Sequence, residues 1–200
     1  MKNKLALLII ILSFTGLAIN VIVNSSGDNL TIWNGLALFR YYTLQSNLLV
    51  LIVFTLYLSN TKKELINKAI GGVSIYITIT FIVFAIMLSS TYHPTGWNQV
   101  SNIISHYIVP IIVLLHLGLN ISDYTFVYRD SLYWIIYPSL YIVFIIIYGT
   151  STNDYLYPFF QVDIIGFWGL VITIIILILF FLVLSFLLVK IVSFTKRNKT

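Results

Sequence analysis

The chain has 200 residues, of which 60% are hydrophobic and only 8% are charged, and its net charge is +5 at pH 7. Soluble domains carry about 25% charged residues, so this composition excludes an ordinary soluble globule. The lack of cysteine excludes disulfides, thiolate nucleophiles and cysteine metal sites. Apolar stretches such as Val171–Val189 do not alternate in polarity as a transmembrane β-strand does. We therefore expect an all-α integral membrane protein, located in the cell membrane.

Six apolar stretches come close to the roughly 20 residues that a helix needs to cross the hydrocarbon core. The first follows Lys2 and Lys4, as a signal peptide would, but it continues to Val23 without an A-x-A cleavage site, so we interpret it as a span. We expect one transmembrane domain, 1–200, without a soluble domain or a long linker. The six predicted transmembrane helices are Leu5–Val23, Tyr41–Ser59, Ala69–Ser89, Asn102–Asn120, Leu132–Gly149 and Phe167–Val189.

Basic residues lie at the ends of these spans and are divided very unequally between the two sides of the membrane. Arg40 is the only one on one side, and the other ten are on the opposite side. Cytoplasmic loops carry the excess of Lys and Arg, so both termini are predicted to be cytoplasmic. This placement at span ends also argues against a nucleic-acid partner. The ten residues are Lys2, Lys4, Lys62, Lys63, Lys68, Arg129, Lys190, Lys196, Arg197 and Lys199.

In this orientation the second, fourth and sixth spans begin at the outer surface, and polar residues gather at their outer ends while the cytoplasmic halves are almost wholly apolar. Hydrophobicity alone does not require such a one-sided distribution, and polar groups at membrane depth usually face the interior of the bundle. We interpret it as the main functional signal in the sequence. The residues are Thr43, Gln45, Ser46 and Asn47, then Asn102, Ser105 and His106, and finally Asp163.

Thr43, Ser46 and Asn47 share one face of the second predicted helix, because residues three and four apart are neighbours on a helix surface. A structural interpretation exists for each: Thr43 can bond back to its own helix, and Asn47 can hold two helices together, as such residues commonly do in membranes. For Thr43 taken alone, this structural interpretation is the more common one.

His106, in the segment NIISHYIVP, is a functional candidate because a histidine is costly to bury within a span. Asn102 precedes it by one turn. Pro110 has no N–H to bond the carbonyl of His106, so we expect a kink and a polar or wet pocket there. The alternative is an interfacial histidine beside an ordinary proline kink. His116 does not share a helix face with His106, and His93 lies in an outer loop, so we expect no metal site.

Asp163 precedes the sixth predicted span, and its simplest role is a solvated N-cap of that helix. It can also complete a catalytic set with Thr43 as hydroxyl nucleophile and His106 as imidazole base, in which Asp163 orients the imidazole. Common membrane depth does not by itself establish contact between them. Further orienting groups or groups near a developing oxyanion are Asn47, Ser46 and Asn102.

Four segments, YYTLQSNLL, HYIVP, IIYPSLY and LYPFFQVD, resemble in order and spacing the androgen-induced-protein and FAR-17a-like family of integral membrane proteins, and the resemblance covers most of the chain. Animal members are threonine hydrolases that cleave fatty acid esters of hydroxy fatty acids. The resemblance implies that Thr43 is the nucleophile and His106 the base, without a cofactor, and it implies nothing about Asp163. The QSN that follows Thr43 resembles the bacterial branch.

These observations favour a lipid ester hydrolase whose partners are membrane lipids and a lipid ester substrate. One alternative is a transporter of small solutes or lipids, although we find no strong inverted repeat and no charged residue deep in a span. Another is a non-catalytic membrane scaffold whose basic tail, Lys196–Lys199, contacts anionic lipids. The sequence predicts no particular oligomeric state.

Overall fold

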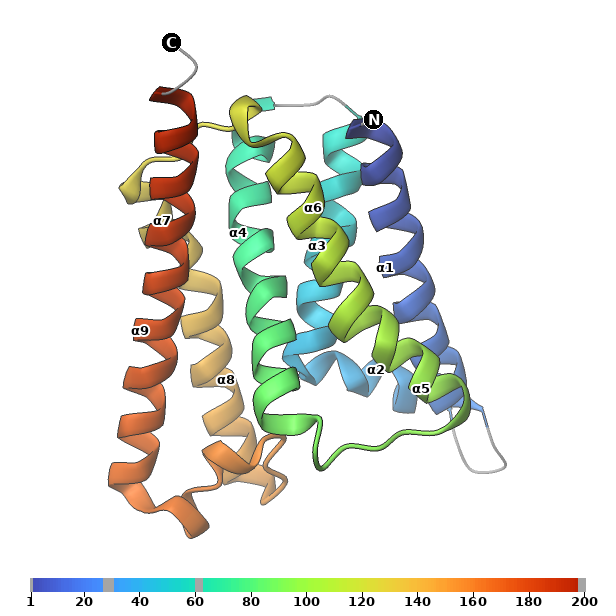
Figure 1. Cartoon of the computed structure of the whole chain (residues 1–200). Coiled ribbons are helices and arrows are strands. Elements are labelled where there is room, and N and C mark those ends of the chain that lie inside the picture. The colour runs from blue at the N-terminus through green and yellow to red at the C-terminus, as the bar shows by residue number, and fades with distance from the viewer. Residues whose placement is uncertain (1, 27–30, 60–62, 198–200) are drawn as a thin grey trace. The chain divides into compact units, whose positions relative to one another are not determined.

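The computed structural model describes residues 2–26, 31–59 and 63–197, which are mostly helical and contain no strand (Figure 1). The all-α prediction is therefore confirmed for these residues. The chain divides into two compact units, of which the first ends at Thr125 and the second is Phe126–Arg197. Lys62 and Lys199, two of the residues that predict orientation, lie outside the described residues.

The first unit contains six α-helices, two 3₁₀ turns and two π turns, counted over the described residues. The helices are α1 (Lys2–Ser25), α2 (Ile32–Ala37), α3 (Tyr42–Leu58), α4 (Lys63–Val83), α5 (Gly96–Ile103) and α6 (Val109–Leu119). The 3₁₀ turns are η1 (Leu38–Arg40) and η4 (Ile121–Asp123), and the π turns are η2 (Phe84–Leu88) and η3 (Ile104–Ile108). The second unit contains α7 (Tyr128–Trp134), α8 (Ile136–Thr152), η5 (Pro158–Phe160) and α9 (Val162–Arg197).

Five helical stretches among the described residues are long and apolar enough to cross a membrane. A sixth span results if Ile32–Arg40 and Tyr42–Leu58 are taken together, although these two segments meet at an angle of 91°. The protein thus has the features of a multi-pass membrane protein with five to six spans. The five stretches are Lys2–Ser25, Lys63–Leu88, Gly96–Leu119, Tyr128–Thr152 and Val162–Arg197.

The kink predicted at Pro110 in the fourth predicted span remains a prediction. Gly96–Leu119 continues as one stretch, and the helix winds through the π turn η3 just before the proline. There the Val109 N–H bonds to the Ile104 carbonyl, five residues back instead of the usual four. This π turn includes His106.

Close packing and polar contacts hold α1 against α5 and η3 in the first unit. The Ser101 hydroxyl donates to the Gly16 carbonyl at 2.9 Å, and the Asn20 amide donates to the Ser101 hydroxyl. A Cβ atom added at Gly16 would lie 2.9 Å from the Ser105 hydroxyl oxygen. Small residues and side-chain hydrogen bonds are the usual means of joining helices in a membrane. The Ser101 hydrogen bonds and the close approach of Gly16 to Ser105 therefore hold η3 beside α1.

In the second unit, α9 is interrupted near its beginning at Gly166, whose φ of 71° and ψ of 170° are not helical. Glycine adopts this left-handed region without the steric cost that other residues pay. The uninterrupted helix follows Gly166, which agrees with the predicted start of the sixth span at Phe167. Asp163 lies before this break, in the first turn of α9.

Candidate active site

The centre of the candidate site is a hydrogen bond between Thr43, in the first turn of α3, and His106, in η3. Thr43 Oγ1 lies 3.0 Å from His106 Nε2, and the two residues are 63 positions apart in sequence. Both side chains are half-buried, so the pair is not closed off from its surroundings. The two strongest candidates from the sequence are therefore brought together by the fold.

A second hydrogen bond determines the tautomer of His106. Its Nδ1 lies 3.2 Å from the Asn102 carbonyl, one turn back on the same helix. A carbonyl only accepts, so Nδ1 carries the proton, and in the neutral imidazole Nε2 is then an acceptor. The Thr43 hydroxyl consequently donates to Nε2. This is the arrangement in which an imidazole can take a proton from an alcohol.

The bend before α3 places Thr43 at a helix start. Tyr41 is extended, with φ of −81° and ψ of 138°, and makes no side-chain cap to α3. The first N–H groups of a helix have no acceptor within it. The first α3 amide with such a bond is Gln45, whose N–H reaches the Tyr41 carbonyl at 3.3 Å. Among the described residues, the Thr43 and Leu44 N–H groups therefore have no backbone acceptor.

Phe84, in the other π turn, stacks on the imidazole of His106. The ring centroids are 3.8 Å apart and the planes differ by 26°. Phe84 is itself buried and makes edge contacts with Tyr92 and Tyr107. The stack covers one face of the imidazole and restricts its rotation. Our sequence reasoning missed Phe84, because it lies in the apolar run VFAIML, which carries no polar signal.

Asn47 and Ser46 lie next to the pair but are engaged in contacts between helices. The Asn47 amide donates to the Thr43 carbonyl at 2.9 Å and to the Ser105 carbonyl at 3.2 Å, which links α3 to η3. Ser46 Oγ lies 2.8 Å from Thr80 Oγ1, which links α3 to α4. Both N–H groups of Asn47 are thus occupied, in agreement with the helix-joining alternative considered for it.

Two amide oxygens near the site, Asn47 Oδ1 and Asn102 Oδ1, are buried without a hydrogen-bond partner among the described residues. A buried oxygen of this kind is costly to leave unpaired, and it can accept a bond from water or from a hydroxyl group. The predicted orienting roles of Asn47, Ser46 and Asn102 remain predictions. The structure brings all three close to the reactive pair.

Asp163 belongs to the second unit, where it is exposed. The orienting role considered for it therefore remains a prediction. In the first unit, His93 is an exposed loop residue whose Nε2 lies 3.0 Å from the Ser90 carbonyl, and His116 lies near the other end of α6. No group of three possible metal ligands comes together in the part of the chain that the structure describes.

Comparison with known proteins gives no match: no protein-family model, no curated protein and no solved structure is similar to this chain. The assignment of an activity therefore depends on the geometry of the site and on the sequence motifs.

Proposed function

We propose that the protein is a membrane-embedded lipid ester hydrolase with Thr43 as nucleophile and His106 as general base. The observation that carries this proposal is the 3.0 Å hydrogen bond between Thr43 Oγ1 and His106 Nε2. A threonine hydroxyl is barely ionised at neutral pH, so it becomes a useful nucleophile only beside a base. The bond from Nδ1 to the Asn102 carbonyl supports the same roles, because it leaves Nε2 free to accept a proton.

The reaction proceeds in two halves. In the first, His106 Nε2 takes the hydroxyl proton while Thr43 Oγ1 bonds to the ester carbonyl carbon, and the bond to the alcohol then breaks. The leaving alcohol takes the proton from Nε2. In the second half, His106 takes a proton from water, whose oxygen attacks the acyl-threonine. The fatty acid leaves, and Thr43 recovers its proton.

The start of α3 can stabilise the oxyanion that forms in each half. The Thr43 and Leu44 N–H groups lack acceptors in α3, and the positive end of the helix dipole lies there. Fixed N–H groups aimed at a developing oxyanion are often the largest single source of catalysis in acyl transfer. We assign them this role ahead of the Asn47 amide, whose N–H groups bond to two carbonyls.

The substrate class follows from the membrane setting and from the motifs. A site among helices of membrane-spanning length suits a lipid that enters from the bilayer. The resemblance to the androgen-induced-protein and FAR-17a-like family favours a fatty acid ester of a hydroxy fatty acid. Trp33 and Trp97, 74% and 66% exposed, lie on α2 and α5 near the Thr43 end and suit a membrane interface. The distribution of basic residues supports placing this end in the outer leaflet of the cell membrane, with cytoplasmic termini.

The first test is labelling of the purified protein with a fluorophosphonate probe, together with hydrolysis of a fatty acid ester of a hydroxy fatty acid. We expect labelling and hydrolysis in the wild type, and neither in Thr43→Ala. His106→Ala should lose at least about 100-fold in rate, the usual contribution of a general base. Thr55→Ala is the matched control, because Thr55 lies on the same helix and bonds only to the Leu51 carbonyl.

Hydrolysis that survives in Thr43→Ala would contradict the assignment of the nucleophile. A folded wild type that hydrolyses no ester and takes up no probe, but moves solutes or lipids in proteoliposomes, would favour the transporter instead. Equal losses in Thr43→Ala and Thr55→Ala would point to a general effect on α3, and so against a role in chemistry.

A further inference from the structure

A second polar feature lies at the opposite end of the first unit, where α1 and α4 begin and α6 ends (Figure 1). An open cavity of about 440 Å³ is found there. It is remote from the reactive pair, because Thr43 and Tyr57 are separated by nearly four turns of α3, about 21 Å. We call this cavity the Lys63 pocket. Its lining residues are Asn3, Tyr57, Leu58, Lys63, Ile66, Asn67 and Asp123.

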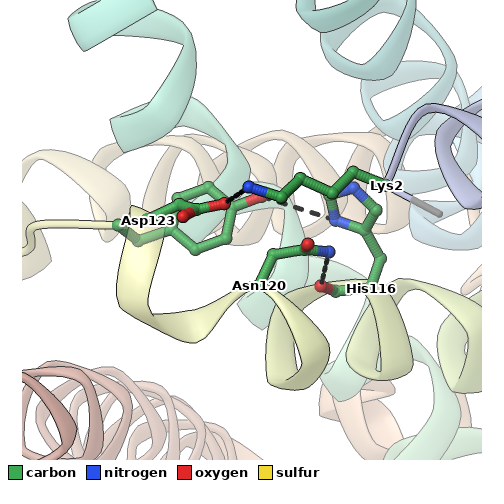
Figure 2. A network of polar contacts seen from close by, with 5 residues as sticks. Lys2, His116, Asn120 and Asp123 are labelled. Atoms are coloured by element: carbon green, nitrogen blue, oxygen red, sulfur yellow. Dashed lines mark hydrogen bonds and ion pairs between the residues drawn. The ribbon is translucent and has the colours of Figure 1, made fainter. Parts of the chain in front are cut away.

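The charges around the Lys63 pocket leave it positive. Its one carboxylate, Asp123, is paired with Lys2, so these two charges cancel (Figure 2). Glu64, the nearest acidic neighbour in sequence, pairs with Lys68 at 3.4 Å instead. Lys63 has no ion pair among the described residues and is exposed. The uncompensated charge in the pocket is therefore one ammonium group.

The neutral polar groups of the pocket can all donate hydrogen bonds. Asn3 and Asn67 bring amide N–H groups from α1 and α4, and Tyr57 brings a phenol from α3. Lys63 adds an ammonium group with three donors. Donors from three helices that converge around one uncompensated positive charge are suited to an anion with several acceptor oxygens.

Hydrogen bonds, an ion pair and a ring contact hold the residues behind the pocket in place. Figure 2 shows Lys2 beside Asp123, which joins α1 to η4, and the Asn120 amide on the His116 carbonyl, at 2.7 Å. His116 is fully buried, and its ring lies edge-on to Tyr57 at 5.4 Å between centroids. Its Nδ1 lies 3.4 Å from the Tyr124 hydroxyl. Such a wall loses little conformational freedom on binding.

We propose that the Lys63 pocket binds a negatively charged phosphate group, carried by an anionic phospholipid or by a soluble phosphate compound. Phosphate offers the acceptor oxygens that these donors require, and the cavity is of headgroup size. The lining residues Leu58 and Ile66 offer apolar surface to an acyl chain, which favours the lipid. Basic pockets between helices on the cytoplasmic side are the usual sites of anionic headgroups. The proposal does not depend on the hydrolase activity.

Binding can be measured by native mass spectrometry of the full-length protein in neutral detergent. Phosphatidylglycerol and phosphatidylcholine with identical acyl chains are the two lipid probes. We expect phosphatidylglycerol to bind at least about fivefold more tightly. Lys63→Gln should lose about fivefold in phosphatidylglycerol affinity, the usual effect of one lysine near an anionic surface. Lys68→Gln, on the same helix but outside the pocket, is the control and should lose much less.

A further arm separates the two sources of phosphate. If inorganic phosphate or glycerol phosphate displaces phosphatidylglycerol at millimolar concentration, the pocket is a site for a soluble phosphate compound. If neither displaces the lipid, the ligand is the phospholipid. Equal binding of phosphatidylglycerol and phosphatidylcholine by the wild type would overturn the proposal. Equal losses in Lys63→Gln and Lys68→Gln would also overturn it, since they would reflect net charge and not the pocket.

Discussion

At the scale of single residues, the reactivity of the candidate site depends on which nitrogen of His106 holds the proton. The Asn102 carbonyl fixes this from one side of the ring, and the Thr43 hydroxyl bonds to the other nitrogen. A backbone carbonyl is thus able to orient the imidazole, which is the role that the sequence suggested for Asp163.

Phe84 supplies the first residue-scale prediction. Phe84→Leu keeps an apolar side chain of similar volume but removes the ring that stacks on His106 at 3.8 Å. A less restricted imidazole spends less time in the reactive orientation, so we expect kcat to fall about tenfold with little change in KM. Phe81→Leu is the control, because it removes a nearby ring whose contact is with Tyr107 and not with the imidazole of His106. Steady-state hydrolysis of the ester substrate by both variants checks this, and an unchanged kcat in Phe84→Leu would contradict it.

Asn47 supplies the second residue-scale prediction. Asn47→Leu removes both hydrogen bonds to the Thr43 and Ser105 carbonyls, which should lower the free energy of unfolding by about 1 kcal/mol. The hydrogen bond that links α3 to η3 is also lost, so Thr43 and His106 should be held together less firmly and hydrolysis should slow. Ser46→Ala removes the contact with Thr80 and a bond to the Thr43 carbonyl within α3, but it leaves the Asn47 bond to the Ser105 carbonyl in place. Thermal unfolding and hydrolysis rates of both variants test the difference. A rate loss in Ser46→Ala as large as that in Asn47→Leu would show that hydrolysis does not depend specifically on the Asn47 hydrogen bond between α3 and η3.

At the scale of elements, the long spans could be predicted from sequence because hydrophobic length is a local property. The two π turns could not, since the hydrophobic length of a segment does not show where a helical turn widens. The right-angled approach of Ile32–Arg40 to α3 was also missed, because its first part is a short helix, α2, of only six residues. The polar residues at the outer ends of the predicted spans indicated Thr43 and His106 as candidates, but only the fold shows that the two are in contact.

The packing of α1 against η3 gives the element-scale prediction. A methyl group added in Gly16→Ala would lie 2.9 Å from Ser105 Oγ and 3.1 Å from Ile104 Cγ2. The side chains of Ser105 and Ile104 must give way, which should cost about 1–3 kcal/mol of stability and disturb the π turn that holds His106 beside Thr43. We expect at least a tenfold loss of hydrolysis. Gly118→Ala is the matched control, because nothing lies within 4 Å of its added methyl group in α6. Comparable losses in both variants would contradict this explanation.

At the scale of the whole molecule, the described part of the first unit carries different chemistry at its two ends. The end where α3 begins holds the hydroxyl and the imidazole, and the end where α4 begins holds the Lys63 pocket. The numbers of Lys and Arg on the two sides predict that the first end is outside the cell and the second inside. Orientation therefore decides which leaflet would supply the ester substrate and which would supply the phosphate ligand that we propose.

The orientation can be tested directly because the natural chain has no cysteine. Thr95→Cys places a thiol at the exposed start of α5, near the Thr43 end, and Glu64→Cys places one on the exposed first turn of α4. We expect a membrane-impermeant maleimide to label Thr95→Cys in intact cells, and Glu64→Cys only after the membrane is permeabilised. The reverse pattern would put the reactive pair in the inner leaflet. The hydrolase would then act on lipids made available in the cytoplasmic leaflet, and the Lys63 pocket would face extracellular phosphate compounds.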